Sequence, residues 1–297
     1  IREEFVHDGK GGGEPTSRVQ ITVTYSDGFG RALQSKQRVE SGPAIKRDAS
    51  GAVVLDINGV PEEEFSPERW LVSGHTVYNN KQHPIRQYEP FYSSSADFEA
   101  DAELETYGVT THYYYDPIGR LIREDMPHGA FSKVETTPWE IRRYDPNDTI
   151  EESLYKTLRE SLPNNHPEKQ ALVKTLAHAD TPSITRLDPL GREIIQIENG
   201  TGGIQLVTES KLNSQGHVIS ITDPRGLTAF TYRRDMLGRT LYEHSIDAGE
   251  TWYLQDALDQ PVHKWDGRGI HQQFSFDTLG RPTSVHVDGG LGLNQVV

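Results

Sequence analysis

The sequence predicts a mainly β protein built of stacked hairpins, and three observations lead to this prediction. Turn formers are abundant, with 27 Gly and 17 Pro in 297 residues. Much of the apolar content is aromatic, with 13 Tyr, 9 Phe and 4 Trp, and such side chains suit a half-buried pleated surface. In the last third of the chain a turn arrives about every 11 residues, which is typical of successive β-hairpins.

The turns repeat one motif, an aromatic residue followed by Asp-x-x-Gly-Arg. The motif is complete at 115–120 and 276–281, and it has a different first residue at 187–192 and 234–239. Residues 25–31 form a related copy with one insertion. The residues that we predict to build these structural turns are Asp27, Gly30, Arg31, Tyr115, Asp116, Gly119, Arg120, Asp188, Gly191, Arg192, Asp235, Gly238, Arg239, Asp277, Gly280 and Arg281.

Each residue type of the motif has a physical reason. The Asp carboxylate can accept a hydrogen bond from the backbone two residues on, and Gly supplies the positive φ of a tight reversal. Arg opens the next strand, where we expect its guanidinium to pair with a neighbouring turn Asp or to stack on an aromatic ring. We expect the aromatic before Asp to stack on its equivalent in the next hairpin.

Two series of turns alternate along the last third of the chain. One series starts at residues 213, 235, 256 and 277, and the other at 223, 247, 266 and 288. Apolar residues alternate with polar ones between the turns, as in Phe274 and Phe276, which predicts one buried face and one wet face. A lone hairpin is marginal in water, so the hairpins are expected to stack into one continuous sheet.

The elements expected before this array are less regular. A loop is expected at 1–18, a hairpin at 19–40, and strands at 52–57, around 70–78, at 110–115 and at 141–144. A helical hairpin is predicted near 149–178, capped by Asn147 or Asp148 and carrying apolar residues at positions 150, 154, 158 and 162, then 172 and 176. We divide the chain into an irregular β-rich segment, 1–181, with the helical insertion, and the regular hairpin array, 182–297.

Composition excludes several functions. A net charge of −14 argues against a nucleic-acid partner and against attraction to anionic lipid. The chain has no Cys for disulfides or thiolate zinc sites, and its 12 His show no metal-ligand spacing. No motif of a metalloprotease, a serine hydrolase or a dinucleotide-binding fold occurs. We therefore predict no catalytic, cofactor-binding or metal-binding residues, no cofactor and no enzyme.

The Asp-x-x-Gly-Arg turns resemble the YD repeats of the RHS family. Several longer strings resemble, more narrowly, the B component of bacterial Tc insecticidal toxin complexes. These strings lie at residues 25–31, 34–36, 69–70, 73–74, 79–81, 88–92, 125–139, 144–149 and 168–178. The resemblance covers nearly the whole chain, and the middle strings are those that indicate the B type.

The resemblance implies a spiral of stacked hairpins that forms part of a hollow shell around a toxic polypeptide. The expected partners are a C-component-like RHS protein and its enclosed toxic region. A Tc A-component pore is expected to bind through a propeller that this chain lacks. The implied setting is a secreted, extracellular virulence factor with no membrane contact by this segment. The chain starts without Met or a signal peptide and is expected to be part of a larger protein.

Two alternatives stay open at this point. One is an RHS-type cell-surface adhesion or carbohydrate-binding module that uses exposed aromatic residues. The other is an enzyme such as a glycoside hydrolase, which would need two carboxylates roughly 5–10 Å apart in a cleft. The turn motif already accounts for most of the Asp residues, including Asp223 and Asp235, so the sequence favours the shell.

Overall fold

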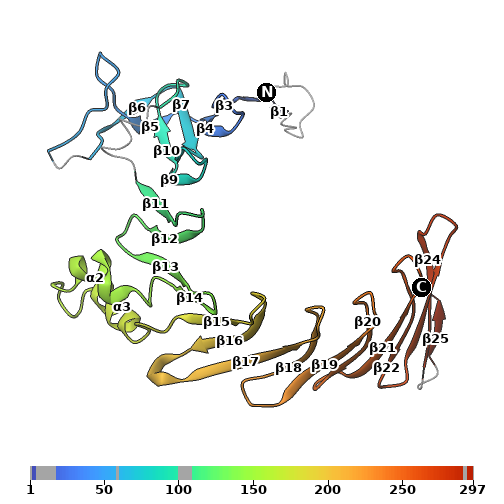
Figure 1. The fold of residues 1–297 in the computed structure, drawn as a ribbon. Coiled ribbons are helices and arrows are strands. Elements are labelled where there is room, and N and C mark those ends of the chain that lie inside the picture. Colours follow the sequence, from blue (N-terminus) through green and yellow to red (C-terminus); the bar gives the residue numbers. More distant parts are fainter. Residues whose placement is uncertain (1, 5–17, 58–59, 100–108, 290–292, 297) are drawn as a thin grey trace. The chain divides into compact units, whose positions relative to one another are not determined.

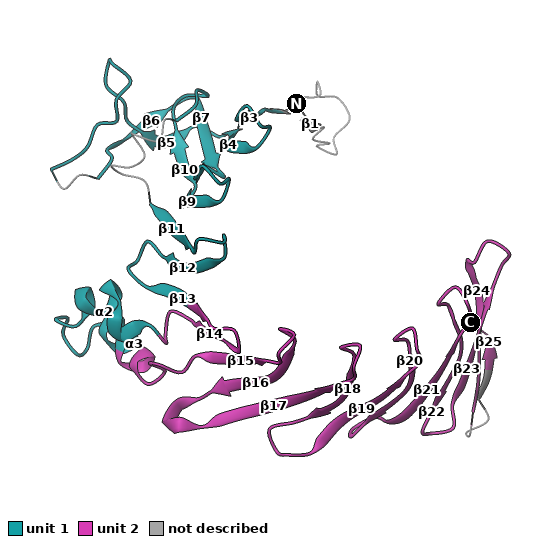
Figure 2. Ribbon diagram, in the orientation of Figure 1, with its two compact units in different colours: residues 1–133, 149–172 teal, residues 134–148, 173–297 magenta. Residues whose placement is uncertain are grey.

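The computed structural model describes residues 2–4, 18–57, 60–99, 109–289 and 293–296. The chain divides into two compact units (Figure 2). Unit 1 comprises residues 1–133 and 149–172, and unit 2 comprises residues 134–148 and 173–297. The predicted division at residue 181 follows the regularity of the repeat rather than spatial contacts, and it stays a prediction.

Unit 1 contains a six-stranded sheet in which distant parts of the chain pair (Figure 1). Its strands, in spatial order, are β3 (Thr22–Ser26), β4 (Ala32–Val39), β7 (Arg69–Ser73), β10 (Phe91–Ser93), β5 (Gly42–Ile45) and β6 (Glu63–Ser66). The pair of β10 and β5 is parallel, and the other pairs are antiparallel. A separate two-stranded sheet joins β1 (Arg2–Glu4) and β2 (Arg18–Gln20).

A second antiparallel run in unit 1 carries the first hairpins of the repeat. Its strands are β8 (Thr76–Tyr78), β9 (Pro84–Tyr88), β11 (Thr110–Tyr115), β12 (Leu121–Asp125) and β13 (Phe131–Thr136). The predicted strand at 110–115 is confirmed. The predicted strand at 52–57 is wrong, because this segment makes only the isolated bridges Arg47–Val53 and Leu55–Pro61.

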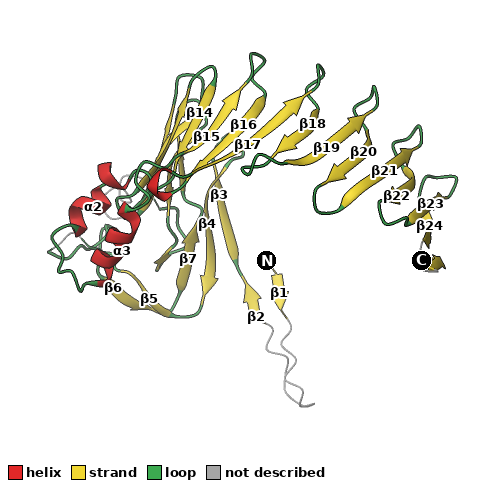
Figure 3. Ribbon diagram, turned by 90° about the horizontal axis from the view of Figure 1, so that it is seen from below, coloured by secondary structure: helices red, strands yellow, loops and turns green. Residues whose placement is uncertain are grey.

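Unit 2 is a run of antiparallel strands that pair in sequence order (Figure 3). The strands are β14 (Glu140–Tyr144), β15 (Ser183–Leu187), β16 (Glu193–Asn199), β17 (Gln205–Leu212), β18 (Val218–Thr222), β19 (Thr228–Arg234), β20 (Thr240–Ser245), β21 (Gly249–Gln255), β22 (Pro261–Asp266), β23 (His271–Phe276), β24 (Pro282–Gly289) and β25 (Leu293–Val296). One short 3-10 turn, η2 (Thr201–Gly203), joins β16 to β17. The predicted stacking of hairpins into one sheet is confirmed within this unit.

The prediction of one buried face is wrong for unit 2. Among its described hydrophobic side chains only Ile184, Ile197 and Tyr242 are buried. Strand β21 alternates between half-buried and exposed residues, so the two faces differ without either being covered. The reason is that, among the described residues of unit 2, no second layer of helices or strands packs on this sheet. The alternation in the sequence records contacts between neighbouring side chains on one face and not a hydrophobic core.

The predicted helical hairpin is present, with different details. It contains a 3-10 turn, η1 (Ile150–Glu152), and the helices α2 (Leu154–Arg159) and α3 (Pro167–Leu176). The cap of α2 is Ser153, whose side chain accepts a bond from the Lys156 N–H, and not Asn147 or Asp148. Asp148 instead accepts from the Thr181 hydroxyl at 2.8 Å. The expected apolar stripe is wrong at Leu154 and Leu158, which are both exposed, because the chain turns at Ser153 and breaks the four-residue spacing.

One predicted turn also differs from the structure. We expected a turn to start at residue 288, but Asp288 lies within β24 and pairs with His271 of β23. Its carboxylate lies 3.2 Å from His271 Nδ1. The rest of the predicted turn, at Gly290, lies outside the described residues.

Candidate functional site

The turn at Asp188 shows how the repeat motif works. Asp188 Oδ1 accepts the N–H groups of Leu190 and Arg192 at 2.9 and 3.0 Å, and the Asp188 carbonyl accepts the Gly191 N–H at 2.9 Å. Gly191 has a φ of 75°, and the strand register shifts between Arg186 and Leu187. This is a turn closed by a glycine bulge, which adds the local twist that a hairpin needs.

The motif arginine closes its own turn. Arg192 Nε donates to Asp188 Oδ2 at 2.6 Å. The same bond, between 2.6 and 2.7 Å, joins Arg31 to Asp27, Arg120 to Asp116, Arg239 to Asp235 and Arg281 to Asp277. The predicted pairing with a neighbouring turn Asp is wrong for the main contact, because a residue four positions on already lies beside the carboxylate; only Arg239 also approaches an Asp of the next described turn, Asp259 at 3.6 Å. The predicted alternative, stacking on an aromatic ring, is confirmed at Arg31, whose guanidinium lies 4.5 Å from the centroid of the Tyr78 ring.

Hydrogen bonds set the ionisation of these carboxylates. The Arg192 guanidinium, followed by the Arg192 N–H, holds the pKa of Asp188 below its usual value. At Asp116 and Asp277 the largest cause of the lowered pKa is the backbone N–H of the motif arginine. The turn carboxylates are thus stabilised as acceptors and are poor proton donors, which disfavours acid catalysis by them.

The aromatic residue before Asp does not stack on an equivalent residue where the structure describes these rings. Tyr115 donates its hydroxyl to the Pro84 carbonyl at 2.8 Å, and its ring lies 4.7 Å from the His83 ring. Tyr25 donates to the Ala96 carbonyl and packs edge-on against Phe98. The aromatic therefore links a hairpin to a preceding or more distant segment, in place of the predicted stack of like residues.

Successive turns on one side of unit 2 also contact each other. We call the turns starting at residues 188, 213, 235, 256 and 277 the apolar rim; they connect alternate strand pairs and so lie at one edge of the sheet. The residue four positions after each turn start reaches the following turn. Arg192 lies 3.3 Å from where a Cβ of Gly216 would be, and Gln260 Nε2 lies 3.0 Å from that of Gly280. His217 covers Gly238 even more closely.

These contacts give the turn glycines a second role besides their positive φ. A Cβ at Gly216, Gly238 or Gly280 would press on the side chain from the preceding turn. Asp259 is an exception on this rim, because it adopts a φ of 68° and carries a Cβ. There the covering residue is Arg239, which lies 3.6 Å from the Asp259 carboxylate and donates to the Asp256 carbonyl at 2.9 Å.

The opposite side of the sheet carries turns of the same type with a different side-chain order. We call the turns at 223–227 and 266–270 the arginine rim. Here Arg225 and Arg268 stand two positions after Asp and pair with Asp223 and Asp266 at 2.5 and 2.8 Å. An apolar residue, Leu227 or Ile270, stands four positions after Asp. On the apolar rim this order is inverted in the turns starting at 188, 235, 256 and 277, with Leu second and a polar residue fourth, whereas the turn starting at 213 has the polar Gln215 in second place.

This inversion of the second and fourth positions can be read from the sequence, but the Asp-x-x-Gly-Arg motif does not include it. The motif is defined by Asp, Gly and the following Arg, and the two residues between Asp and Gly are variable in it. Comparison of the second and fourth positions after Asp separates the turns starting at 188, 235, 256 and 277 from those starting at 223 and 266 without any structure.

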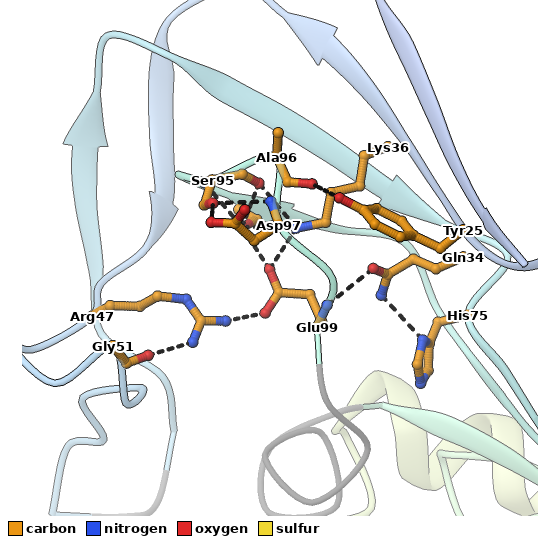
Figure 4. Close-up of polar contacts among 11 residues, drawn as sticks. Tyr25, Gln34, Lys36, Arg47, Gly51, His75, Ser95, Ala96, Asp97 and Glu99 are labelled. Carbon is orange, nitrogen blue, oxygen red and sulfur yellow. Dashed lines mark hydrogen bonds and ion pairs between the residues drawn. The ribbon is translucent and has the colours of Figure 1, made fainter.

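Unit 1 contains a buried ionic cluster that the sequence did not reveal (Figure 4). Lys36 of β4 is fully buried, and its Nζ donates to Glu99 Oε1 at 2.7 Å and to the Ser95 carbonyl at 2.9 Å. Arg47 pairs with the other oxygen of Glu99. Ser93 Oγ donates to Glu99 Oε1 at 2.6 Å. One carboxylate thus holds two cations and a hydroxyl.

The cluster extends along β4 to a histidine. The Glu99 N–H donates to Gln34 Oε1 at 3.1 Å, and Gln34 Nε2 lies 3.0 Å from His75 Nδ1. Burial lowers the pKa of Lys36, and the adjacent Glu99 carboxylate opposes this shift. Because both charged groups are enclosed and bonded, the arrangement fixes residues 93–99 against the sheet and presents no reactive group to solvent.

A polar hollow of about 510 Å³ lies in unit 2 beside β14, β15 and η2. Two carboxylates, Glu140 and Asp180, line it. Glu140 accepts from Arg142 Nε at 2.6 Å and lies 3.5 Å from Arg186 Nε. The Arg142 guanidinium is the largest cause of the lowered pKa of Glu140. A carboxylate held ionised between two guanidinium groups lacks the raised pKa of a glycosidase acid.

Within the described ranges, no group of three or more His, Asp or Glu side chains could hold a metal ion. No helix in the same ranges is long and apolar enough to cross a membrane.

No protein-family model matches the sequence, and no curated protein matches it. Solved structures do match. The chain aligns with the Photorhabdus luminescens Tc holotoxin pore at 27% identity and a TM-score of 0.78. It aligns with the TcdB2–TccC3–Cdc42 complex at 26% and 0.80, and with TcdB2–TccC3 lacking the hypervariable C-terminal region at 28% and 0.79. The fold is that of a Tc toxin shell.

The predicted fold class, a mainly β shell segment with one helical hairpin, is thereby confirmed. Each of these alignments covers 95% of this chain and 13% of the matched chain. The chain therefore spans about an eighth of the length of the proteins that it resembles. The likeness supports a Tc toxin B–C type of fold and a coarse shell-like role.

Proposed function

We propose that this chain is a wall segment of the B component of a Tc-type toxin complex. In this role its sheet would form part of an RHS shell that encloses a toxic polypeptide and shields it before translocation. The alignment over 95% of the chain with TcdB2–TccC3 complexes supports this proposal. The middle strings at 125–139, 144–149 and 168–178, which resemble the B component, favour B over C.

The single observation that carries the proposal is the uncovered sheet of unit 2. Strands β14 to β25 run side by side, and only three of their described hydrophobic side chains are buried. A globular domain would cover one face with a second layer. A wall needs both faces, because one meets the solvent and the other meets the contents of the shell.

The proposal extends to partners and location. The wall would be completed by a C-component-like RHS protein whose toxic region is the cargo. An A-component pore would bind elsewhere in the longer B protein, and the complex would act after secretion. In this arrangement function is spread over a surface, so no residue of this chain needs to touch a reacting bond.

Protease protection tests this function. The longer protein that contains this segment is co-expressed with a C-component-like partner, and the purified complex is digested with a nonspecific protease. The proposal predicts that the toxic region survives until the shell is denatured. Digestion of that region at the same rate with and without the B protein would overturn the proposal.

A second candidate, a carbohydrate-binding module, is favoured by one observation. Trp252 and Trp265 stand directly opposite each other on β21 and β22 and are 43% and 38% exposed. Against it, the Trp265 ring lies parallel to the His271 ring with centroids 5.1 Å apart, so one ring face is already occupied. Tryptophan fluorescence is titrated with oligosaccharides in the parent and in Trp252→Ala. A change in the parent that is lost in the variant would favour the carbohydrate-binding module, and no change in either would favour the shell wall.

A further inference from the structure

A chain of polar contacts connects three strands on one face of unit 2. His263 Nδ1 of β22 lies 2.9 Å from His271 Nε2 of β23, and His271 Nδ1 lies 3.2 Å from Asp288 Oδ2 of β24. The strand register creates this chain, because His271 stands directly opposite both Trp265 and Asp288. His263 is two positions from Trp265 and so lies on the same face. The centroid of the Trp265 ring lies 5.1 Å from that of His271 and 5.3 Å from that of His263.

The two bonds of this chain fix the positions of the protons. A carboxylate only accepts, so His271 donates its Nδ1–H to Asp288, and its Nε2 carries a lone pair. His263 must then donate its Nδ1–H to that lone pair, and its own Nε2 can take up one more proton without breaking either bond. A second additional proton would place an N–H on both of the facing nitrogens. The bond between the imidazoles would be lost, and two cations would lie side by side.

The strands beside the chain offer little charge to compensate a second proton. Leu254 of β21 and Gln273 of β23 stand directly opposite His263, and neither is charged. On the same face of β21 the titratable side chain is Glu250, which accepts the Tyr242 hydroxyl at 3.0 Å. The two protons would therefore repel each other with no carboxylate beside His263 among the described residues.

Strand β24 supplies one carboxylate for two histidines. Asp288 contacts His271, and its Oδ2 also lies 4.0 Å from His286 Nε2. The residues of β25 that stand opposite this pair, Asn294 and Val296, are uncharged. Asp288 is therefore the single described carboxylate that can stabilise a cation in the chain, and it does so at His271.

This asymmetry determines which imidazole moves. A protonated His271 keeps the Asp288 carboxylate and a parallel contact with the Trp265 ring, whose π face attracts a cation. His263 has lost its hydrogen bond and has no carboxylate partner in the described part of the chain. A second proton therefore expels His263 and uncovers the side of Trp265 that it contacts. The strands are paired through their backbones, so their register is unaffected.

We propose that His263, His271 and Asp288 form a proton-operated latch over Trp265. The latch is closed in neutral solution, with the two imidazoles hydrogen-bonded to each other. In mild acid, where histidine side chains ordinarily change their charge, both rings become cationic and His263 swings out. This face of the sheet then gains positive charge and an accessible indole ring. The latch goes beyond the proposed wall function and does not depend on it.

Nitrogen NMR of the histidine rings tests the closed latch in the parent protein. At pH 8 the proposal predicts that His263 and His271 both carry their proton on Nδ1, because only this pair of tautomers makes both bonds. A proton on Nε2 of either neutral ring would overturn the latch. This measurement needs no variant, so it holds even where a substitution disturbs the fold.

Acrylamide quenching of Trp265 fluorescence tests the opening. The contribution of Trp265 is the difference between the parent and Trp265→Phe. Between pH 8 and pH 5 we expect quenching of Trp265 to increase in the parent. The increase should be lost in His263→Gln, because an amide can donate to neutral His271 and accept from protonated His271. His244→Gln removes an imidazole from the same face outside the latch and should behave as the parent.

Three results would contradict the opening. They are unchanged quenching in the parent, an equal increase in His263→Gln, and loss of the increase in His244→Gln as well. Circular dichroism at both pH values should show the same strand content, since the proposal moves a side chain and leaves the strands paired. Unfolding of the parent by pH 5 would also contradict it.

Discussion

Unit 1 and unit 2 are each stabilised internally, by different kinds of contact. Unit 1 has a small core, with Ala44 and Val72 fully buried, and an enclosed ionic cluster around Lys36. The cluster joins Lys36 to Glu99, which are 63 positions apart in the sequence. Unit 2 has almost no core, and its turns are closed by bonds between residues two and four positions apart.

This difference teaches how the two units should respond to damage. A contact between distant segments fixes the topology of unit 1, so its loss should weaken the unit as a whole. In unit 2 each hairpin contacts mainly its neighbours, so a single loss should remain local, as in repeat proteins. The predictions below test this contrast, starting with the largest expected effect.

Removal of the Lys36 charge should have the largest effect. Lys36→Met leaves Glu99 buried with one cation fewer, and such a loss costs about 3–5 kcal/mol of unfolding free energy. Denaturant unfolding of the parent and of Lys36→Met measures this difference. The double variant Lys36→Met, Glu99→Gln should recover part of it, because the amide removes the unbalanced charge. A Lys36→Met variant as stable as the parent would refute the structural role of the cluster.

Two glycines of unit 2 should differ although both have a positive φ. Gly226→Ala has open space around its new Cβ and should cost about 1–2 kcal/mol for the left-handed backbone alone. Gly238→Ala also presses on His217 and should cost about 1 kcal/mol more. His217→Ala should remove that excess in Gly238→Ala and leave Gly226→Ala unchanged. Equal costs at the two positions would show that the contact between turns has no energetic weight.

Acid should weaken unit 2 through its turn carboxylates. The pKa values of five of them are lowered in the folded protein, at Asp188 chiefly by the Arg192 guanidinium; the five are Asp188, Asp223, Asp235, Asp266 and Asp277. Their contribution is therefore complete above the unfolded pKa of about 4 and is lost as the pH falls through the folded pKa. Hydrogen exchange of β15 to β24 should be constant from pH 7 to 5, after correction for intrinsic rates, and should show opening below about pH 4.

Asparagine provides the matched control for this pH dependence. Asn213 already starts a turn, with its Oδ1 accepting the N–H groups of Gln215 and His217 at 3.0 and 2.9 Å. The triple variant Asp188→Asn, Asp235→Asn, Asp277→Asn should therefore keep the turns and lose part of the acid sensitivity. The same acid transition in the variant and the parent would assign the effect to other carboxylates.

The smallest effect is expected on the outer side of α2. Leu158 is 65% exposed, so Leu158→Gln should change the unfolding free energy by no more than about 0.5 kcal/mol. Ile150→Ala, at a fully buried position of the adjoining 3-10 turn, should cost about 2–5 kcal/mol. Similar values at the two positions would mean that the described burial of this insertion is wrong.

The sequence predicted those features that depend on near neighbours along the chain. The Asp-x-x-Gly turns at 116–120, 188–192, 235–239 and 277–281 are closed by hydrogen bonds within five residues. The motif itself is therefore sufficient to predict these turns. The strand at 110–115 and the order of the hairpins in unit 2 follow from the same regular spacing.

Features that depend on distant contacts were not predictable in this way. Lys36, Arg47 and Glu99 are ordinary charged residues until the six-stranded sheet brings them together. Leu154 and Leu158 follow a helical spacing, but the extended backbone at Ser153 interrupts the helical conformation, and both leucines are exposed to solvent. The alternation in β21 and its neighbours suggested a buried face because a sequence pattern cannot show whether a second layer exists.

The most direct test of the central claim, that this chain is part of a shell wall, is an electron-microscopy reconstruction of the longer protein with its C-component-like partner. The account predicts a hollow particle in which strands β14 to β25 form a single-layered wall around weaker internal density. A solid particle, in which a second layer of this same protein covers one face of these strands, would contradict it.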